Sequence, residues 1–550
     1  MSESLVARRR PSARTVLVVA GILAVAVVLR FWKLRWGLRD GMAFVDELQM
    51  WPSYLTAFVP LRPTSFLRED SPAALLYPAF YGFLSGGAVA VTHALGMIPA
   101  PTANVFPALY VARIVAASAS LLNVALIGLL AWRVATPRAG LIAAALAAVV
   151  PVEAMQAHYV SVDPLLGLCT TLALLFACEL ARSGKLLAAV AAGAGAGLSF
   201  SAKYTGLVTF GTCGWAILEV CARERSVVPL LRLLPAAIAG FLVFVLLACP
   251  PCVLQSDLMF RAIRGLSNIS SSSYLAFWNV QLVPTLGWYG RPYVYQLVAG
   301  LPFGFGWPLY LTILAGVVAA VRRHDVADRV LLVTLAAYFL SVGMSFVVEA
   351  TRYYIPMVPI VLVFVARMLD GLRAPRVRTA VLAVVWAYTA VFTLTQVQRY
   401  SFAQQMGLAS WVKEALPAPA AGTKHRVAYP QGLDPYYGLR QPLIWAGMTP
   451  VAAPSGRWLD DRPEVFVMPE LTAVRLKRDD PGSPDTEQLA RLESGATGYK
   501  PVATWRSHYL QSGFYTWLDP AFTGDYAQGE IGFTVYLRPD LMRPGLAGAS

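Results

Sequence analysis

Charged residues are scarce in this sequence. Only 14% of its 550 residues are Asp, Glu, Lys or Arg, whereas 57% are apolar. A soluble globular protein carries about 25% charged residues. A chain with so few charges cannot cover a water-exposed surface with polar side chains, which excludes an ordinary soluble protein. Most of the chain is therefore expected to face lipid.

The segment 401–550 lacks the basic excess of the rest of the chain. It has 14 basic and 15 acidic residues, so the net charge of +14 comes from the first 400 residues. A soluble nucleic-acid-binding domain would be basic, and this distribution argues against one. A basic excess confined to the hydrophobic part is typical of a membrane protein whose cytoplasmic loops hold Lys and Arg.

Cysteines are few, and the segment 401–550 has none. All six lie in or at the ends of apolar runs, which favours small core residues. Cys249 and Cys252 have the spacing of a redox motif, but they end an apolar run and have no thioredoxin-like context. The sequence does not decide whether these two residues form a disulfide.

Long apolar runs dominate the first 400 residues. A membrane-spanning helix needs about 20 mostly apolar residues. Eleven runs are predicted to span: 15–32, 108–132, 139–157, 163–181, 186–202, 204–221, 229–249, 296–321, 328–348, 353–369 and 379–397. The first resembles a signal peptide, but it lacks a small-residue cleavage site and is interpreted as an uncleaved span.

The loops between these runs form two chemical classes. The basic class is predicted to be cytoplasmic. These basic loops hold Arg8 to Arg14, Arg133 with Arg138, Arg182 with Lys185, Arg223 with Arg225 and Arg232, Arg322 with Arg323 and Arg329, and Arg367 with Arg373, Arg376 and Arg378. The other class contains isolated acids and single bases. The two classes alternate if the further apolar stretch 73–97 is an outer juxtamembrane or re-entrant helix rather than a span. The basic run Arg30, Lys33, Arg35 and Arg39 does not fit this pattern.

The chain is predicted to consist of a membrane domain, 1–400, and a soluble domain, 401–550, of typical size. The soluble domain should contain a helix at 402–415 and strands at 427–429, 465–468 and 533–537. We therefore expect a polytopic α-helical membrane protein with about 11 transmembrane helices, a cytoplasmic N-terminus and a C-terminal extracytoplasmic α/β domain.

Ionisable residues at membrane depth are costly and often functional. On the predicted topology, those outside the basic loops collect at the outer face, although they come from six segments. They are Asp46, Glu47, Arg113, Glu153, His158, Asp163, Lys203, Glu349 and Arg352. Carboxylates there could act as a base or bind metal, and Arg and Lys could hold phosphate.

Several of these residues also have structural explanations. Asp46 and Glu47 could be a solvated loop pair, although their aromatic and apolar neighbours favour a partly buried pair that acts as a base. Asp163 is a good helix N-cap. Lys203 could extend to the membrane interface instead of anchoring a lipid phosphate, and Arg352 has the same ambiguity.

Taken together, these motifs resemble the GT-C glycosyltransferases. The nearest branch contains the protein O-mannosyltransferases, the lipid A aminoarabinose transferases and their bacterial relatives. The matching features are Asp46–Glu47, the Pro72 helix, Arg113, the motif from His158 to Asp163–Pro164, Lys203–Tyr204, and Arg352–Tyr353 with Pro356. The resemblance covers residues 15–400, and it implies a GT-C-like membrane domain in the plasma or inner membrane.

The resemblance also implies partners and roles. The donor would be a polyprenyl-phosphate-linked sugar, and the acceptor would be an extracytoplasmic protein, glycolipid or cell-envelope polysaccharide. Asp46 would be the general base, and Glu47 would orient Asp46 or the acceptor. Cationic residues would neutralise the leaving phosphate. The residues implied in donor phosphate binding are Arg113, Lys203, Arg352 and Tyr353.

His158 and Asp163 form a second motif of this resemblance, and the sequence departs from the family at residues 70–73. His158 and Asp163 would shape the site or, with Asp46, hold a divalent cation in members that use one. The family usually has a Lys or His before a Pro-Pro pair, whereas this sequence has Asp70-Ser-Pro-Ala73. The donor or acceptor contact usual at that place is therefore in doubt.

Two other functions are alternatives. A transporter or flippase would show internal repeats and helices broken near the bilayer midplane, but no second half repeats the Gly-rich run 192–197. That run is better explained by close helix packing. A scaffold whose outer domain binds a partner would leave the charge cluster unexplained.

Overall fold

The computed structural model describes most of the chain. The described residues are 12–38, 47, 77–254, 256, 257, 259–261, 263, 291, 293–343, 351–398, 400, 403–419, 422–431, 439–479, 481–505 and 532–541. Asp46, Glu349 and the segment 70–73 lie outside them.

The described part of the first 400 residues is helical. The helices are α1 (Ala13–Phe31), α3 (Phe80–Ala94), α4 (Val105–Val134), α5 (Pro137–Val149), α6 (Pro151–Gln156), α7 (Asp163–Ser183), α8 (Leu186–Ala202), α9 (Val208–Glu224), α10 (Val228–Ala248), α11 (Pro250–Leu254), α13 (Leu301–Phe305), α14 (Trp307–Arg323), α15 (Val326–Val342), α16 (Val358–Asp370) and α17 (Pro375–Gln398). Short 3-10 or π turns are η3 (Tyr204–Leu207), η5 (Gln296–Gly300) and η6 (Thr351–Met357).

Within these residues, six helices are long and apolar enough to cross a membrane: α4, α7, α9 with η3, α10, α16 with η6, and α17. A seventh results if η5–α13 and α14 form one span, bent by 114°. The bend lies at Gly306, whose φ of 78° favours glycine. The protein is thus a polytopic helical membrane protein, and the number of 11 spans stays a prediction.

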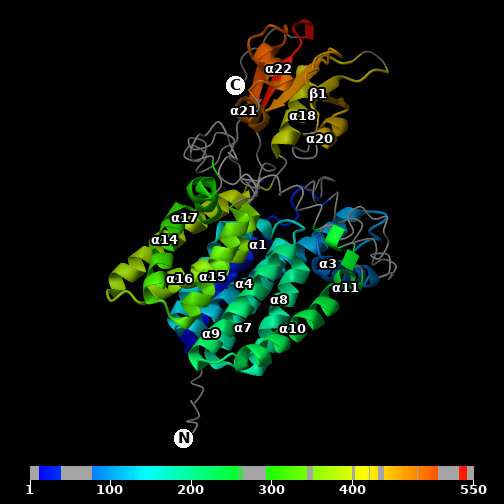
Figure 1. The fold of residues 1–550 in the computed structure, drawn as a ribbon. Helices are drawn as coiled ribbons and strands as arrows, with labels where there is room; N and C mark the ends of the chain where they lie inside the picture. The colour runs from blue at the N-terminus through cyan, green and yellow to red at the C-terminus, as the bar shows by residue number, and fades with distance from the viewer. Residues whose placement is uncertain are drawn as a thin grey trace.

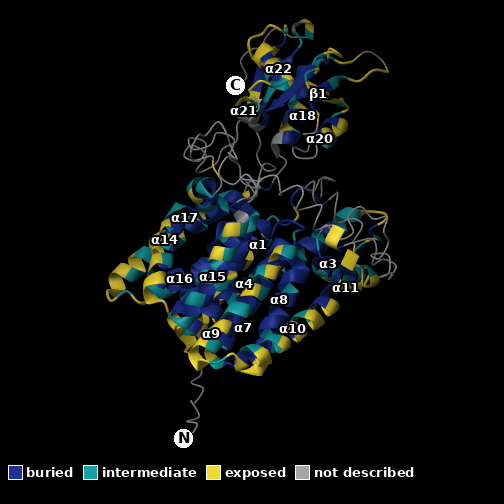
Figure 2. Cartoon of the chain, viewed as in Figure 1, coloured by how far each residue is buried: buried dark blue, intermediate teal, exposed yellow. Residues whose placement is uncertain are grey.

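The outer surface of the bundle supports this assignment. Leu17, Leu187 and Leu231 are 72%, 78% and 74% exposed, and Figure 2 shows exposed residues along α10 and α14. Such apolar exposure is unfavourable in water, whereas lipid tails accommodate it. These helices therefore have a lipid-facing side.

Glycines allow α8 and α10 to pack with their backbones in contact. A Cβ atom at Gly193 would overlap the carbonyl oxygen of Ala237, and one at Gly197 would lie 2.5 Å from that of Phe241. Packing of small residues is a principal means of helix association in membranes. The structure confirms that the Gly-rich run is a packing surface.

We expect Gly193→Ala to lower the stability of the protein by about 1–3 kcal/mol, because the added methyl group forces the two helices apart. Thermal unfolding of the purified protein in detergent measures this effect. Gly214→Ala is the control, since a Cβ there meets nothing within 4 Å. Equal melting temperatures for the two variants would contradict the packing explanation.

The basic loops are joined to one another at one end of the bundle. The links run from Arg182 to the carbonyl of Val134, from Arg223 to that of Ala181, from Arg232 to that of Gly184, from Arg329 to Glu219, from Arg367 to Asp328, and from Arg138 to Asp370. Each link connects the ends of two different helices. The basic loops joined by these links therefore do share one face of the structure. The N-terminal run from Arg8 to Arg10, predicted to lie on the same side, is outside the described residues.

Two basic residues at the end of the first span and just after it, Arg30 and Lys33, do not fit the loop pattern but have partners within the protein. Arg30 is fully buried and donates to the carbonyl oxygens of Ala147 and Ala148 at 2.9 and 2.8 Å. It thereby caps the C-terminal end of α5, where unpaired carbonyls favour a cation. Lys33 donates to the carbonyl of Gln398 at 2.6 Å. These contacts explain basic residues at the end away from the basic loops.

The apolar stretch 73–97 contains α3, a helix of 15 residues. At 1.5 Å per residue it is about 22 Å long, shorter than the hydrocarbon core of a bilayer. It lies near α11 at the end of the bundle nearest the sheet domain (Figure 1), and the N–H of Ala79 donates to the Cys249 sulfur at 3.3 Å. It is not among the described helices that are long and apolar enough to span, and its place outside the bilayer core stays a prediction.

The C-terminal part contains an α/β domain. Its sheet has the strand order β2 (Thr449–Ala453), β1 (Arg426–Pro430), β3 (Val465–Pro469), β5 (Phe533–Leu537) and β4 (Lys500–Trp505). The pairs β1–β2 and β1–β3 are parallel, and β3–β5 and β4–β5 are antiparallel. The helices are α18 (Ala403–Ala415), α20 (Arg440–Trp445), α21 (Glu470–Asp479) and α22 (Pro484–Glu493), followed by the turn η7 (Pro539–Leu541). The structure confirms the predicted helix and the three predicted strands.

Candidate functional site

Lys203 lies at the centre of the first of two polar clusters. It follows α8 directly and is only 7% exposed. Its ammonium donates to Asp163 at 2.8 Å and lies 5.6 Å from the ring centre of Tyr77 and 5.0 Å from that of Tyr353. A lysine that extends to the interface would have an exposed ammonium. The alternative explanation for Lys203 is therefore wrong, because the group is buried, paired and held by aromatic rings.

Arg352 completes this cluster from η6. Its guanidinium lies 5.8 Å from the ring centre of Tyr353, and both side chains are half-buried. Tyr77, just before α3, brings a third segment of the chain to Lys203. We call Tyr77, Asp163, Lys203, Arg352 and Tyr353 the lysine cluster. It combines two cations, one carboxylate and two phenol rings.

Asp163 does not have its predicted structural role. It is the first residue of α7 rather than the N-cap, which is Val162. Its N–H is instead satisfied by the Ser161 hydroxyl, which also donates to the Asp163 carboxylate, each at 3.2 Å. Because Pro164 follows at the start of the helix, the turn is fixed and the carboxylate can point to Lys203.

Glu47 and Arg113 form the second cluster. Both side chains are fully buried, and the two oxygens of Glu47 accept from Nε and Nη2 of Arg113 at 2.8 and 2.6 Å. Nη1 of Arg113 donates to the carbonyls of Leu34 and Trp36. Glu47 also accepts from the N–H of Val160 at 2.8 Å. This two-pronged pairing is the strongest form of the Arg–carboxylate contact.

The two clusters share one loop, residues 157–162 between α6 and α7. The backbone N–H of Val160 in this loop donates a hydrogen bond to Glu47. The carboxylate of Asp163, the residue that follows the loop, accepts one from Lys203. Three residues of extended chain span at most about 11 Å, so the two clusters lie side by side. Asp46, whose own position is outside the described residues, is the immediate neighbour of Glu47 in the chain.

His158 has a structural environment in this loop. Its Nδ1 lies 2.8 Å from the carbonyl oxygen of Ala154, and its Nε2 lies 2.8 Å from that of Trp32. The ring stacks on Tyr400 with centroids 4.7 Å apart. Both nitrogens are thus directed at carbonyl oxygens, so His158 fixes the loop and presents no ring nitrogen to a metal.

A metal site was one possibility for this region. Among the residues with described positions, no group of three or more His, Cys, Asp or Glu could hold a metal ion. Asp163 is paired with Lys203, and Glu47 is paired with Arg113. The described carboxylates of the two clusters are therefore each paired with a side-chain cation.

Beneath the loop, Glu153 belongs to a buried polar network. Its carboxylate accepts from Ser120 at 3.0 Å and from Asn123 at 2.8 Å. Ser120 in turn accepts from Arg30 at 2.8 Å, and Asn123 accepts from Thr171 at 2.6 Å. The network connects α1, α4, α6 and α7, so it fixes the helix ends from which the two clusters project.

We expect Glu47→Gln to destabilise the protein by about 3–5 kcal/mol, because a buried Arg113 charge is left without a counter-charge. Thermal unfolding in detergent measures the loss. Glu179→Gln is the matched control: its pair with Arg133 is 3.6 Å long and solvent-exposed, and such pairs contribute about 0–1 kcal/mol. A small, equal change in both variants would mean that Glu47 is not held as described.

Residues 107–248 match the family model described as dolichyl-phosphate-mannose-protein mannosyltransferase. The matched segment includes Arg113, His158, Asp163 and Lys203, and thus parts of both clusters. This segment of the chain is similar to that glycosyltransferase family. The match agrees with the resemblance to the protein O-mannosyltransferases that the sequence indicates. No curated protein matches the sequence.

Several solved structures are similar to this chain at low sequence identity. ArnT from Cupriavidus metallidurans, bound to undecaprenyl phosphate, is 15% identical with a TM-score of 0.48, and the match covers 98% of this chain and 100% of that chain. The Archaeoglobus fulgidus oligosaccharyltransferase in complex with Zn and sulfate is 12% identical with a TM-score of 0.45, covering 84% and 68%.

The S. cerevisiae protein O-mannosyltransferase Pmt1-Pmt2 complex, bound to the sugar donor, is 17% identical with a TM-score of 0.35, covering 46% of this chain and 35% of that chain. TM-scores below 0.5 do not define the positions of individual side chains. The site therefore rests on the contacts given above.

Proposed function

We propose that the protein transfers a sugar from a polyprenyl-phosphate donor to an acceptor on the extracytoplasmic side of the membrane. The observation that carries this proposal is the lysine cluster, in which two cations and two phenol rings from three segments of the chain meet. The cluster lies beside the loop 157–162, whose Val160 donates a hydrogen bond to Glu47. A lipid-linked sugar presents a phosphate to such a cluster at the membrane surface. The family match supports the sugar chemistry.

The proposed role of Lys203 and Arg352 is to bind the donor phosphate. Cleavage of the sugar–phosphate bond leaves an additional negative charge on the polyprenyl phosphate. Fixed cations in a site with little water stabilise that charge as it develops. Asp163 holds the Lys203 ammonium at 2.8 Å, so Asp163 acts as a positioning residue. Tyr353 and Tyr77 limit the positions that the ammonium can take.

The proposed base is Asp46. Its carboxylate would take the proton of the acceptor hydroxyl while the acceptor oxygen forms a bond to the anomeric carbon of the sugar. The bond from that carbon to the phosphate oxygen breaks, and the polyprenyl phosphate leaves with the electron pair. A single displacement of this kind inverts the anomeric carbon. The role follows by analogy with the family.

Arg113 and Glu47 would support this chemistry indirectly. Both carboxylate oxygens of Glu47 are taken up by Arg113, and both side chains are fully buried. This geometry favours a positioning role for Arg113 over direct contact with a donor phosphate. Glu47 would fix the chain next to Asp46, in agreement with the orienting role that the family implies.

The proposed orientation places the basic loops in the cytoplasm. The links among these loops define one face, and positively charged loops favour the cytoplasmic side. The lysine cluster and the α/β domain then lie outside. Two single-cysteine variants test this orientation: Ser226→Cys in the basic face and Ser494→Cys in the α/β domain. When intact cells are treated with a membrane-impermeant maleimide, only the cysteine at position 494 should react.

A transfer assay tests the proposed function. The purified full-length protein is incubated with undecaprenyl-phosphate-linked radiolabelled sugars and with membranes from a strain that lacks the protein. We expect label to move from the lipid to an acceptor fraction for at least one sugar, with release of undecaprenyl phosphate. Donor movement across liposomes without any transfer would instead establish the flippase alternative and overturn the proposal.

A further inference from the structure

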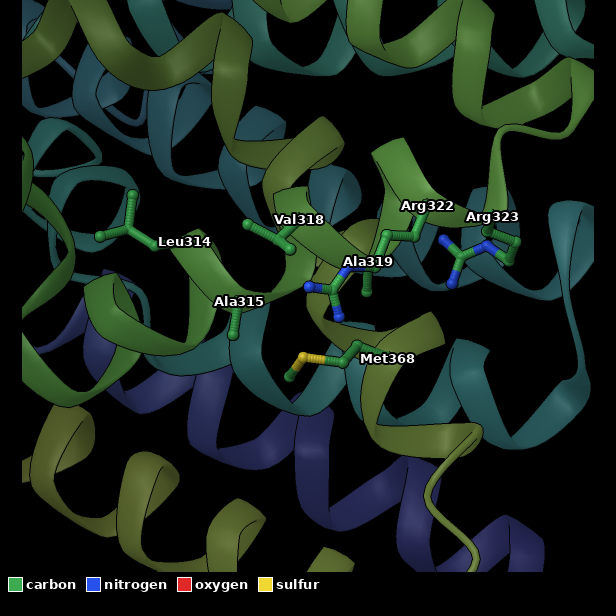
Figure 3. Close-up of a pocket in the computed structure, with 7 residues that line it drawn as sticks. All are labelled: Leu314, Ala315, Val318, Ala319, Arg322, Arg323 and Met368. Atoms are coloured by element: carbon green, nitrogen blue, oxygen red, sulfur yellow. The ribbon is translucent and has the colours of Figure 1, made fainter.

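A groove lies along the exposed side of α14, with Met368 of α16 opposite, close to the basic loops. Its volume is about 740 Å³, and its walls include Leu314, Val318, Ala319, Met368, Arg322 and Arg323. Figure 3 shows Leu314 at one end, the two arginines at the other, and Met368 across from Ala319. The groove thus has an apolar part and a cationic part.

The dimensions of the groove suit a lipid chain. Leu314 and Arg322 are eight residues apart on one helix, which corresponds to about 12 Å along its axis. Leu314 and Val318 are 41% and 49% exposed, so the apolar wall is open to the bilayer. The groove therefore runs from the hydrocarbon region to the polar boundary at the basic face.

Among the described residues, charge pairing leaves Arg322 without an acidic partner at the mouth of this groove. Arg323 bonds Asp328 at 2.6 Å, and Arg367 bonds both Asp328 and Asp325. Burial raises the pKa of Asp325, but the hydrogen bonds from Arg367 and from the N–H of Asp328 outweigh it and lower this pKa to about 2. Asp325 and Asp328 are thus paired with Arg323 and Arg367, two of the three arginines near the groove.

Arg322 is the third arginine. It is exposed, and the described residues provide it with no acidic partner. In Figure 3 its guanidinium points toward Met368, over the groove. A cation in the last turn of a helix is favoured by the helix dipole alone. The dipole does not, however, require the side chain to lie over an apolar groove.

We propose that this groove binds one anionic phospholipid of the cytoplasmic leaflet. An acyl chain lies along Leu314 and Val318, and the lipid phosphate accepts from Arg322. The match is one of charge and shape: the cytoplasmic leaflet is rich in anionic lipids, which basic pockets between helices bind. Guanidinium groups pair well with phosphate oxygens. The site lies on the face opposite the lysine cluster and is independent of it.

Native mass spectrometry of the full-length protein tests this site. The protein is titrated with phosphatidylglycerol and with phosphatidylcholine of the same acyl chains. We expect tighter retention of one phosphatidylglycerol and about a tenfold loss of its affinity in Arg322→Gln, which removes a charge-assisted hydrogen bond. Arg225→Gln, an exposed arginine at the end of α9 on the same face, should bind like the wild type.

A second variant tests the apolar part. Ala315→Phe, at an exposed lining position, fills the groove without altering a charge, and it should also weaken retention of phosphatidylglycerol. Equal affinity for the two lipids in the wild type would overturn the proposal. So would equal losses in Arg322→Gln and Arg225→Gln, or unchanged retention in Ala315→Phe, because these results indicate non-specific attraction to the basic face.

Discussion

Asp46→Asn is expected to reduce sugar transfer by about a thousandfold while donor binding is retained. A positioned general base contributes about 10²–10⁴ in rate, and an amide cannot take the acceptor proton. Asn has nearly the same shape as Asp, so the neighbouring Glu47–Arg113 pair should persist. The loss should therefore appear in kcat rather than in the affinity for the donor lipid.

The measurement compares transfer and donor binding for the wild type and the variant. Asp257→Asn is the control, because Asp257 is an exposed acid whose pair with Arg261 is also exposed. We expect this control to have wild-type transfer. Unimpaired transfer by Asp46→Asn would remove Asp46 from the role of base, and loss of donor binding with transfer would assign it to the donor site instead.

Lys203→Met is expected to have two separable effects. Transfer should fall by about 10²–10³, since one cation that stabilises the leaving phosphate is lost. Stability should fall by about 3–5 kcal/mol, because Asp163 keeps a buried charge without a partner. A loss of activity in this variant alone would not distinguish the two effects.

The double variant Lys203→Met/Asp163→Asn separates them. It removes both charges of the pair, so most of the stability should return, whereas transfer should remain low because the cation is still absent. Thermal unfolding in detergent and the transfer assay are measured on the same preparations. Recovery of transfer together with stability would mean that Lys203 has only a structural role.

Much of the membrane architecture could be predicted from the sequence, because its signals are local. Apolar runs of spanning length predict the helices, and the basic loops predict which helix ends share a face. In the α/β domain, the strands at 427–429, 465–468 and 533–537 were predictable from short apolar runs. Their order in the sheet depends on contacts between segments distant in sequence and was not.

The candidate site was predictable in composition but not in its pairings. The sequence indicates that Lys203, Asp163, Glu47 and Arg113 are unusual charges, because each interrupts or borders an apolar run. It does not indicate that Glu47 pairs with Arg113, since 66 positions separate them. The family resemblance therefore placed Arg113 with the donor phosphate, while its contacts favour positioning.

Tyr77 was missed because it has no signal of its own. A tyrosine next to Pro78 in an apolar stretch is an ordinary residue of a membrane protein, and only the fold brings it to Lys203. Arg30 had a signal, its position at the end of the first span, but that signal suggested a loop residue. Its partners, Ser120 and the end of α5, come from other segments.

The most direct test of the account is an experimental structure of the full-length protein with undecaprenyl phosphate. The proposed mechanism predicts that the lipid phosphate lies within hydrogen-bonding distance of the Lys203 ammonium and the Arg352 guanidinium, with the Asp46 carboxylate facing the same space. A phosphate bound elsewhere, with Lys203 still paired only to Asp163, would contradict the proposed site.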